Sequence, residues 1–261
     1  MPRRIHQLCA GLGRHLHLLP ELPKRPDHRG RPWRDSREVL NGTLWILRTG
    51  AQWSEMPSRY PPYQTCHRRF QQWRESGVMD RLLEALARDL ERRGKINLEE
   101  CFIDGSFSPA KKGALEFGKT KRGKGSKNMA IADRTGLPVA LCTGSASPHE
   151  TKFVTELIDQ CFTEDKHERL IGDKAYDSDP LDAACAAKGV TMISPHKTNR
   201  KKPKSQDGRA LRRYNRRWKV ERLFAWLQNY RRLVTRFEYH IENFLAFLKL
   251  AAFMILAKKY L

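Results

Sequence analysis

The chain has 261 residues, enough to bury a sizeable core and to form one catalytic domain of ordinary size with a smaller module. Its 50 lysines and arginines against 29 acids give a formal net charge of +21, which favours a polyanionic partner and argues against an enzyme of acidic substrates or small metabolites. Six tryptophans and an apolar fraction of 39% argue against a basic ribosomal or membrane-surface protein, so nucleic acid is the expected partner.

The first part of the chain favours an extended arm. Residues 1–34 carry several prolines among basic residues, and we expect residues 1–30 to form a flexible basic lead-in. Arg14, His15 and His17 interrupt the weakly apolar start, so neither a signal peptide nor a membrane span is expected. The six cysteines stand singly, without zinc-finger spacing, and are expected to be small buried residues in a reducing cytosol.

Three helices are expected next, because apolar residues recur at helical spacing from Asp35 or Ser36 to Gly50, over 63–73 and over 79–90. The second helix carries Arg68 and Arg69 away from its apolar stripe. Such a trio predicts a helix-turn-helix-like DNA-binding module over residues 31–95, with these arginines on DNA. A plain helical bundle with basic faces is the alternative, and the net charge favours DNA.

From about residue 100 the hydrophobic period changes to that of strands. Strands are expected over 101–107, 128–134, 137–144, 169–173 and 190–194, with a hairpin turn at Arg134, Thr135 and Gly136. Helices are expected over 149–162, 179–188, 207–231 and 241–260. Meandering strands followed by alternating helices and strands predict an α/β fold with a mixed sheet, and we assign residues 96–261 to a catalytic domain.

Three carboxylates stand out in this part. Asp104 and Asp173 are expected at the ends of strands beside Gly105 and Gly172, where an ion and a phosphate would have room to approach. Glu221 lies at the border of a helix's apolar stripe, and Tyr214 and Arg217 share its face at offsets of seven and four residues.

Hard carboxylate oxygens are the ligands that Mg²⁺ prefers, and phosphoryl transfer to DNA commonly uses two such ions roughly 3.5 to 4 Å apart. Any one of these carboxylates alone is more often solvated or a helix cap. The combination of Asp104, Asp173 and Glu221 predicts a site for Mg²⁺, with Mn²⁺ as a substitute.

Two basic loops accompany these carboxylates. Residues 196–217 contain ten lysines and arginines against Asp207 alone, and residues 111–127 contain seven against Glu116. A solvated face is the usual explanation of such a run, but its place beside the expected site favours contact with a phosphate backbone. The residues expected to contact DNA from these loops are Lys121, Arg122, Lys201, Lys202, Arg212 and Arg213.

Three other patterns point to chemistry only weakly. GKTKRGKG (118–125) approaches a phosphate-binding P-loop but has Gly125 where Ser or Thr should bind magnesium. His149 and Glu150 are expected to begin a helix near the site. Trp226 and Tyr230 could stack on an extruded base, although aromatic residues beside Leu227 are more often core.

Five blocks of the sequence resemble the insertion-sequence-five group of bacterial DDE transposases, which have a ribonuclease-H-like core. They are LNGTLWILRTGAQWSEMP (40–57), FIDGSFSPAKKG (102–113), ASPHET (146–151), RLIGDKAYDSDPLDA (169–183) and RRYNRRWKVERLFAWLQNYRRLVTRFEYH (212–240). The resemblance implies that Asp104 and Asp173 are catalytic and that Glu221 is the glutamate of the YREK signature. Tyr214 and Arg217 match its first two members, whereas Gln228 replaces the lysine and is left out of the catalytic set.

The expected function is that of a DNA transposase that cuts the ends of an insertion sequence and joins the freed 3′ hydroxyls to target DNA. The resemblance implies double-stranded DNA as partner, both as terminal inverted repeats and as target, a homodimer on DNA, and a place in the bacterial cytoplasm at the nucleoid. A non-mobile nuclease of the same fold and an inactive or regulatory DNA-binding derivative are the alternatives.

Overall fold

The protein is described by a computed structural model that covers residues 19, 20, 32–111, 114–201, 203, 205, 206 and 208–260. The expected basic arm over residues 1–30 lies outside these residues except for Leu19 and Pro20, and Lys202 also lies outside them.

The helices of the first part follow the local signals in the sequence. They are α3 (Ser36–Thr49), the 3₁₀ turn η1 (Trp53–Glu55), α4 (Tyr63–Glu75) and α5 (Val78–Arg92). Asp35 caps α3 by accepting the backbone N–H groups of Arg37 and Glu38, and Gly50 ends it in the left-handed region at φ 71°. The three expected helices are therefore confirmed.

A mixed sheet forms the centre of the molecule. Its strands are β1 (Cys101–Pro109), β2 (Gly118–Thr120), β3 (Gly123–Ala132), β4 (Pro138–Ser145), β5 (Arg169–Ile171) and β6 (Thr191–Ile193). The order is β2-β3-β1-β5-β6, and β4 also pairs with β3. The β1–β3 and β3–β4 pairs are antiparallel, whereas β1–β5 and β5–β6 are parallel. The α/β class with a mixed sheet is confirmed, and β2 is an additional strand.

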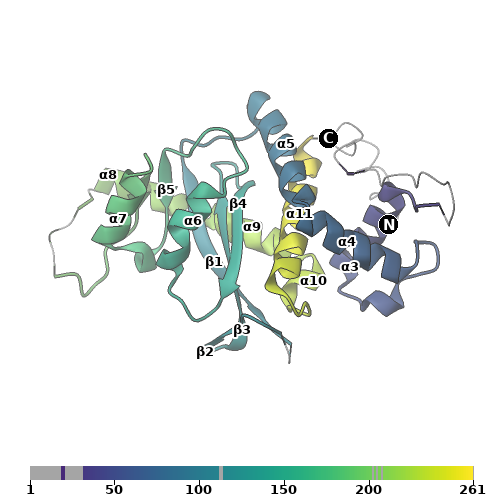
Figure 1. The fold of residues 1–261 in the computed structure, drawn as a ribbon. Helices are drawn as coiled ribbons and strands as arrows, with labels where there is room; N and C mark the ends of the chain where they lie inside the picture. The colour runs from purple at the N-terminus through teal and green to yellow at the C-terminus, as the bar shows by residue number, and fades with distance from the viewer. Residues whose placement is uncertain are drawn as a thin grey trace.

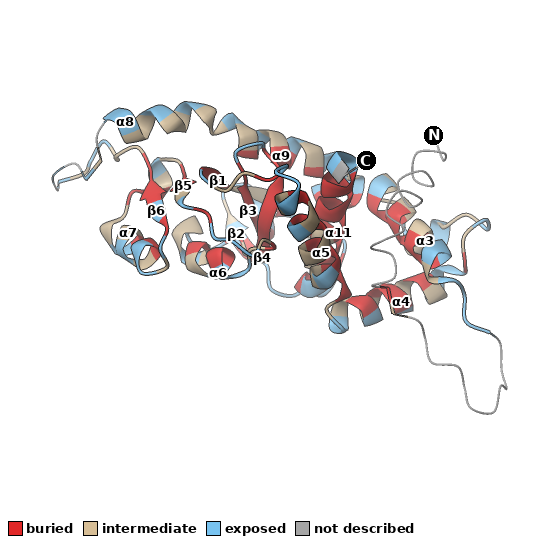
Figure 2. Cartoon of the chain, turned by 90° about the horizontal axis from the view of Figure 1, so that it is seen from above, coloured by how far each residue is buried: buried red, intermediate tan, exposed pale blue. Residues whose placement is uncertain are grey.

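Helices cover both faces of this sheet. Figure 2 shows α8 (Gly208–Leu211) and α9 (Trp218–Gln228) on one side of the strands, and α6 (Val154–Asp159) and α7 (Asp179–Ala186) on the other. The last helix, α11 (Ile241–Tyr260), contacts both α5 and β4.

Helix α11 lies between the sheet and the first helices (Figure 1). Most of its length is buried, as expected for a helix that is apolar all round. Phe247 of α11 stacks on Phe70 of α4 with ring centroids 4.3 Å apart. One hydrophobic core therefore runs from α3 to α11 among the described residues. The division of the chain near residue 95 stays a prediction.

Two expected helices are shorter than the periodicity indicated. The segment 149–162 forms a 3₁₀ turn, η2 (Glu150–Phe153), and the short α6, because the backbone N–H of Phe162 bonds to Val139 of β4. The expected helix over 207–231 is broken by the 3₁₀ turn η4 (Arg212–Arg216). Residues three apart align in a 3₁₀ turn, and there Arg213 and Arg216 both bond to the buried Glu100.

The remaining short elements connect the larger ones. They are η3 (Lys174–Tyr176), between β5 and α7, and α10 (Arg231–Val234), between α9 and α11. Among the described residues, no helix combines the length and the apolar character needed to cross a membrane.

Candidate active site

The pairing of β1 with β5 brings the two aspartates together. Cys101 pairs with Leu170 and Phe102 with Ile171 in a parallel register. Asp104 lies two residues beyond Phe102 and Asp173 two residues beyond Ile171, so both stand at the same level on neighbouring strands. Asp173 follows the end of β5, as expected, whereas Asp104 was wrongly expected at a strand end: β1 continues to Pro109, and Asp104 still pairs with Ala130 of β3. Carboxyl ends of parallel strands are where open sheets place their ligand groups.

The surroundings of each aspartate fix its side chain. Asp104 Oδ1 accepts the backbone N–H of Gly105 at 2.9 Å, and Asp173 caps η3 by accepting the N–H of Ala175 at 2.8 Å. The space beside the two glycines is not free, contrary to the sequence-based expectation. A Cβ on Gly172 would lie 2.6 Å from the ring of Tyr176.

Arg217 connects Asp104 to Glu221. Its Nη1 donates to Asp104 Oδ2 and its Nη2 donates to Glu221 Oε1, each at 2.7 Å. Glu221 lies in the first turn of α9, four residues after Arg217, so one guanidinium reaches both carboxylates. The guanidinium carbon of Arg217 also lies 5.8 Å from the ring centroid of Tyr214. Arg217 thus contacts both Tyr214 and Glu221, as expected from their spacing on the helix.

Burial and charge act against each other at this site. Burial raises the pKa of Asp104 and Glu150 raises it further, whereas Gly105 and Arg217 lower it, and the net shift is upward. Burial lowers the pKa of Arg217, but Asp104 and Glu221 outweigh burial and the net shift is again upward. A nearby cation would therefore stabilise the charged form of Asp104.

A fourth carboxylate, Glu150, was not among the expected site residues. It is the first residue of η2, and its Oε2 accepts the hydroxyl of Tyr176 at 3.1 Å. Burial and the charges of Glu150, Asp104 and Asp173 raise the pKa of that phenol well above its ordinary value. The expected start of a helix at His149 and Glu150 is confirmed, since the side chain of His149 caps η2. That start and the block ASPHET (146–151) were the sequence signals pointing to Glu150.

The donor chemistry of the site suits a hard divalent cation. Asp104, Asp173 and Glu221 supply only oxygen ligands, and the guanidinium of Arg217 already holds a positive charge between two of them. In the part of the chain that the structure describes, no three His, Cys, Asp or Glu side chains are arranged to hold a metal ion. The residues fit such an ion by charge and donor type, with Arg217 standing between Asp104 and Glu221 in this conformation.

The residues expected to contact DNA divide into free and engaged groups. Arg68, Lys121, Arg122, Lys201 and Arg212 are exposed or partly exposed and available for DNA. Lys121 and Arg122 form the turn between β2 and β3. This hairpin rules out a P-loop at residues 118–125, because a P-loop leads from a strand into a helix.

Two arginines assigned to DNA are engaged elsewhere. Arg69 is 4% exposed, donates to Ser36 Oγ at 2.7 Å and lies over the ring of Trp73. The prediction that Arg69 contacts DNA was wrong, because its guanidinium closes the contact between α3 and α4. Arg213 donates to Glu100 at 2.8 Å, so its charge is paired within the fold.

The basic loop after β6 is tied to the segment that follows Asp173. Asp177, only 3% exposed in its side chain, accepts the backbone N–H of Lys197 at 2.8 Å and the guanidinium of Arg200 at 2.7 Å. His196 lies 3.1 Å from the same carboxylate. Asp177 therefore holds the basic loop next to the segment of Asp173, where the loop was expected to lie.

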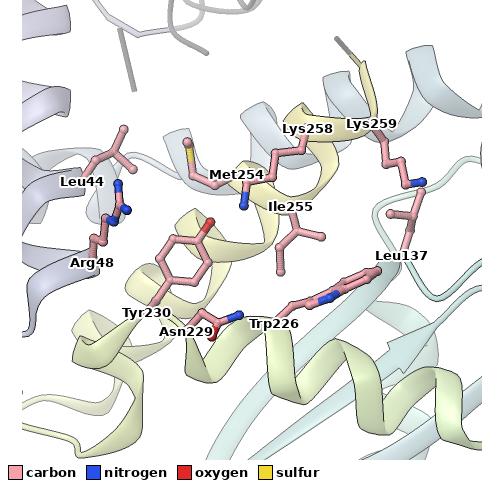
Figure 3. A pocket seen from close by; sticks show the side chains of 10 residues that line it. All are labelled: Leu44, Arg48, Leu137, Trp226, Asn229, Tyr230, Met254, Ile255, Lys258 and Lys259. Atoms are coloured by element: carbon pink, nitrogen blue, oxygen red, sulfur yellow. The ribbon is translucent and has the colours of Figure 1, made fainter. Parts of the chain in front are cut away.

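A cavity of about 640 Å³ lies away from these carboxylates, between α3, α9 and α11 (Figure 3). Trp226 and Tyr230 line it together with Arg48, and both aromatic residues also pack against the core. Burial raises the pKa of Tyr230 to about 12. None of the expected catalytic residues is among those that line this cavity. This packing agrees with the expectation that the two aromatic residues are part of the core.

Comparisons with known proteins agree along most of the chain. Residues 98–256 match the family described as "Transposase DDE domain", and residues 14–83 match "Putative transposase of IS4/5 family". The first match alone covers more than half of the chain.

Two proteins of Burkholderia cepacia are similar. "Insertion element IS402 uncharacterized 16.2 kDa protein" is 32% identical over 105 residues, which are 40% of this chain and 71% of that protein. "Putative transposase for insertion sequence element IS402" is 30% identical over 139 residues, covering 50% of this chain and 62% of that protein.

One solved structure is similar in fold. It is the cryo-EM structure of the piggyBac transposase synaptic complex with hairpin DNA, with a TM-score of 0.54 at 11% identity. The likeness covers 99% of this chain and 75% of that chain. It supports the fold of the sheet and its helices.

Proposed function

The chain belongs to the family of transposases with a DDE domain, and from this we propose that Asp104, Asp173 and Glu221 are its catalytic carboxylates. The protein is a metal-dependent DNA transposase. The register of β1 and β5 carries the proposal, because it puts Asp104 and Asp173 at the same level on neighbouring strands. The bridge from Arg217 to Asp104 and Glu221 adds the third carboxylate.

Mg²⁺ is the proposed ion, with Mn²⁺ able to replace it, because all the proposed ligands are carboxylate oxygens. When bound, divalent cations would activate a nucleophile and offset the charge on the phosphate oxygens. Asp104 and Asp173 would hold them from neighbouring strands. Glu221 would join them once Arg217 no longer donates to Glu221 Oε1.

The proposed reaction has two in-line displacements. In the first, a water oxygen attacks phosphorus at the end of the element, the bond to the 3′ oxygen breaks, and a 3′ hydroxyl is freed. In the second, that hydroxyl oxygen attacks a phosphorus of target DNA and displaces the target's own 3′ oxygen. Arg217, freed from Glu221, would donate to a phosphate oxygen, and Tyr214 would limit where its guanidinium can lie.

DNA binding follows from the family, and its details are proposals. The helices within residues 31–95 and the two basic loops would hold the terminal inverted repeats and the target, with Arg68, Arg212 and the β2–β3 turn facing phosphate. Lys201 extends this surface on the loop that Asp177 anchors. A homodimer on double-stranded DNA would bring the two ends of an element together.

The test incubates the purified protein with a plasmid carrying the gene and its flanking DNA, in Mg²⁺, in Mn²⁺ or in EDTA. We expect metal-dependent breaks at both borders of the element and joined products in target DNA, mapped by primer extension. Asp173→Asn should give no breaks, because the amide lacks the charge that binds the ion but keeps an oxygen to cap η3. Its melting temperature should stay close to that of the unchanged protein.

The other outcomes identify the alternatives. Cleavage without strand joining would indicate a non-mobile nuclease of this fold. Specific binding without cleavage in any metal would indicate a regulatory or inactive derivative. Full activity of Asp173→Asn would contradict the proposed catalytic set.

The β2–β3 turn should contribute to DNA binding through phosphate contacts. In Lys121→Ala/Arg122→Ala, the slope of log binding constant against log salt should become shallower by about 1.8, or about 0.9 for each lost phosphate contact. Lys95→Ala/Lys166→Ala is the matched control, since both lysines are exposed and neither is among the residues expected to contact DNA. Equal slopes for the two double variants, measured by fluorescence anisotropy, would remove the turn from the DNA surface.

A further inference from the structure

Glu150 lies directly against the strand that carries Asp104. It follows β4 and begins η2, where the capping side chain of His149 fixes the direction of the turn. A Cβ on Gly105 would lie 2.9 Å from Glu150 Oε1. The carboxylate of Glu150 therefore occupies the space that the absent side chain of Gly105 leaves beside Asp104.

Tyr176 holds Glu150 from the other side. Its hydroxyl donates to Glu150 Oε2 at 3.1 Å, and its side chain is fully buried. Tyr176 belongs to η3, the turn that Asp173 caps, and its ring packs against Gly172. Glu150 is thus fixed between the segment of Asp104 and the segment of Asp173.

The two oxygens of Glu150 differ in their partners. Oε2 has the hydroxyl of Tyr176, whereas Oε1, which lies against Gly105, has no hydrogen-bond partner among the described residues. Two carboxylates held near each other in a partly buried site repel each other unless a cation lies nearby. Arg217 donates to Asp104 and Glu221, and no bond from it to Glu150 is formed in the described part of the chain.

We propose that Glu150 is a fourth carboxylate of the active site, which binds the divalent cation together with Asp104 through Oε1. Tyr176 is its positioning residue, because a hydrogen bond to Oε2 leaves Oε1, which lies against the neighbouring Gly105, available for the cation. The proposal rests on the proposed function of Asp104 and Asp173. In a purely structural role, by contrast, the carboxylate of Glu150 would only accept the hydrogen bond of the buried Tyr176 hydroxyl.

The test measures Mn²⁺ binding to the full chain without DNA by electron paramagnetic resonance, which needs no catalytic turnover. We expect Glu150→Gln to weaken Mn²⁺ binding by about tenfold or more, and Tyr176→Phe to weaken it less. Glu156→Gln is the matched control, an exposed glutamate six residues further along in α6, and should bind as the unchanged protein does. Thermal melting of each variant checks the fold.

Two further variants keep the outcomes distinct. Glu150→Asp keeps the charge, so cleavage by this variant should recover at high Mn²⁺ concentration, whereas a purely structural defect would not respond to the metal. Asp104→Asn reports on the proposed function itself. Weaker Mn²⁺ binding in Asp104→Asn with unchanged binding in Glu150→Gln would overturn only the role of Glu150. Unchanged Mn²⁺ binding in both Asp104→Asn and Glu150→Gln would overturn the metal site as a whole. If Glu150→Gln does not fold, unchanged Mn²⁺ binding in Glu150→Asp and Tyr176→Phe would overturn the role of Glu150.

Discussion

Replacing Arg217 by alanine should lower strand cleavage on the order of a hundredfold while Mn²⁺ binds at least as tightly as before. Cleavage should fall because the variant loses a charged donor for the phosphate in the transition state. Metal binding should hold or improve because the guanidinium that now bonds to both Asp104 and Glu221 is gone. The two effects are separated by measuring cleavage rates at saturating Mn²⁺ and Mn²⁺ affinity without DNA.

Two variants sharpen this prediction. Arg217→Lys should restore little cleavage. The ammonium of lysine is a compact charge and lacks the planar pair of N–H donors with which a guanidinium binds two carboxylates or a phosphate. Arg222→Ala, on the same helix but bonded to Thr135 in the β3–β4 turn, should cleave at nearly the unchanged rate. Loss of Mn²⁺ binding in Arg217→Ala would show instead that Arg217 is needed to assemble the carboxylates.

Replacing Arg236 by methionine should lower the free energy of unfolding by about 3 to 5 kcal/mol, because several buried acceptors lose their donor at about 1 to 3 kcal/mol each. The side chain of Arg236 is fully buried, and its guanidinium donates five hydrogen bonds. The acceptors are the carbonyl oxygens of Leu115, Glu116, Glu238 and Tyr239 and the hydroxyl of Ser126. Methionine fills a similar volume but leaves these oxygens without their donor.

Urea unfolding measures this effect. Arg231→Met, at an exposed arginine of α10, is the control and should change the free energy of unfolding by about 0.5 kcal/mol or less. Arg236→Lys should recover only part of the loss, because three donors cannot replace five. A loss below about 1 kcal/mol in Arg236→Met would mean that water replaces the guanidinium at this point.

Local patterns in the sequence were sufficient for the first three helices and for two of the proposed catalytic carboxylates. Asp35 and Gly50 mark the ends of α3 by their own conformational preferences. Hydrophobic patterning located the strands of Asp104 and Asp173, and parallel pairing of β1 with β5 then brings the two aspartates to the same level, although β1 continues past Asp104 to Pro109. The spacing of four between Arg217 and Glu221 predicted a shared helix face, and the ion pair is there.

Packing between distant segments decided the rest. In the sequence a charged residue is expected to be solvated, so Arg69 was assigned to DNA and Arg236 received no role, although both are buried with specific acceptors. Glu150 was expected only to begin a helix, because its neighbours Gly105 and Tyr176 are 45 and 26 residues away in the chain. Helix periods, caps and strand ends depend on neighbours along the chain, and the sequence therefore determined them. The desolvation of a charge depends on which distant segments surround it, and only the tertiary structure decides that.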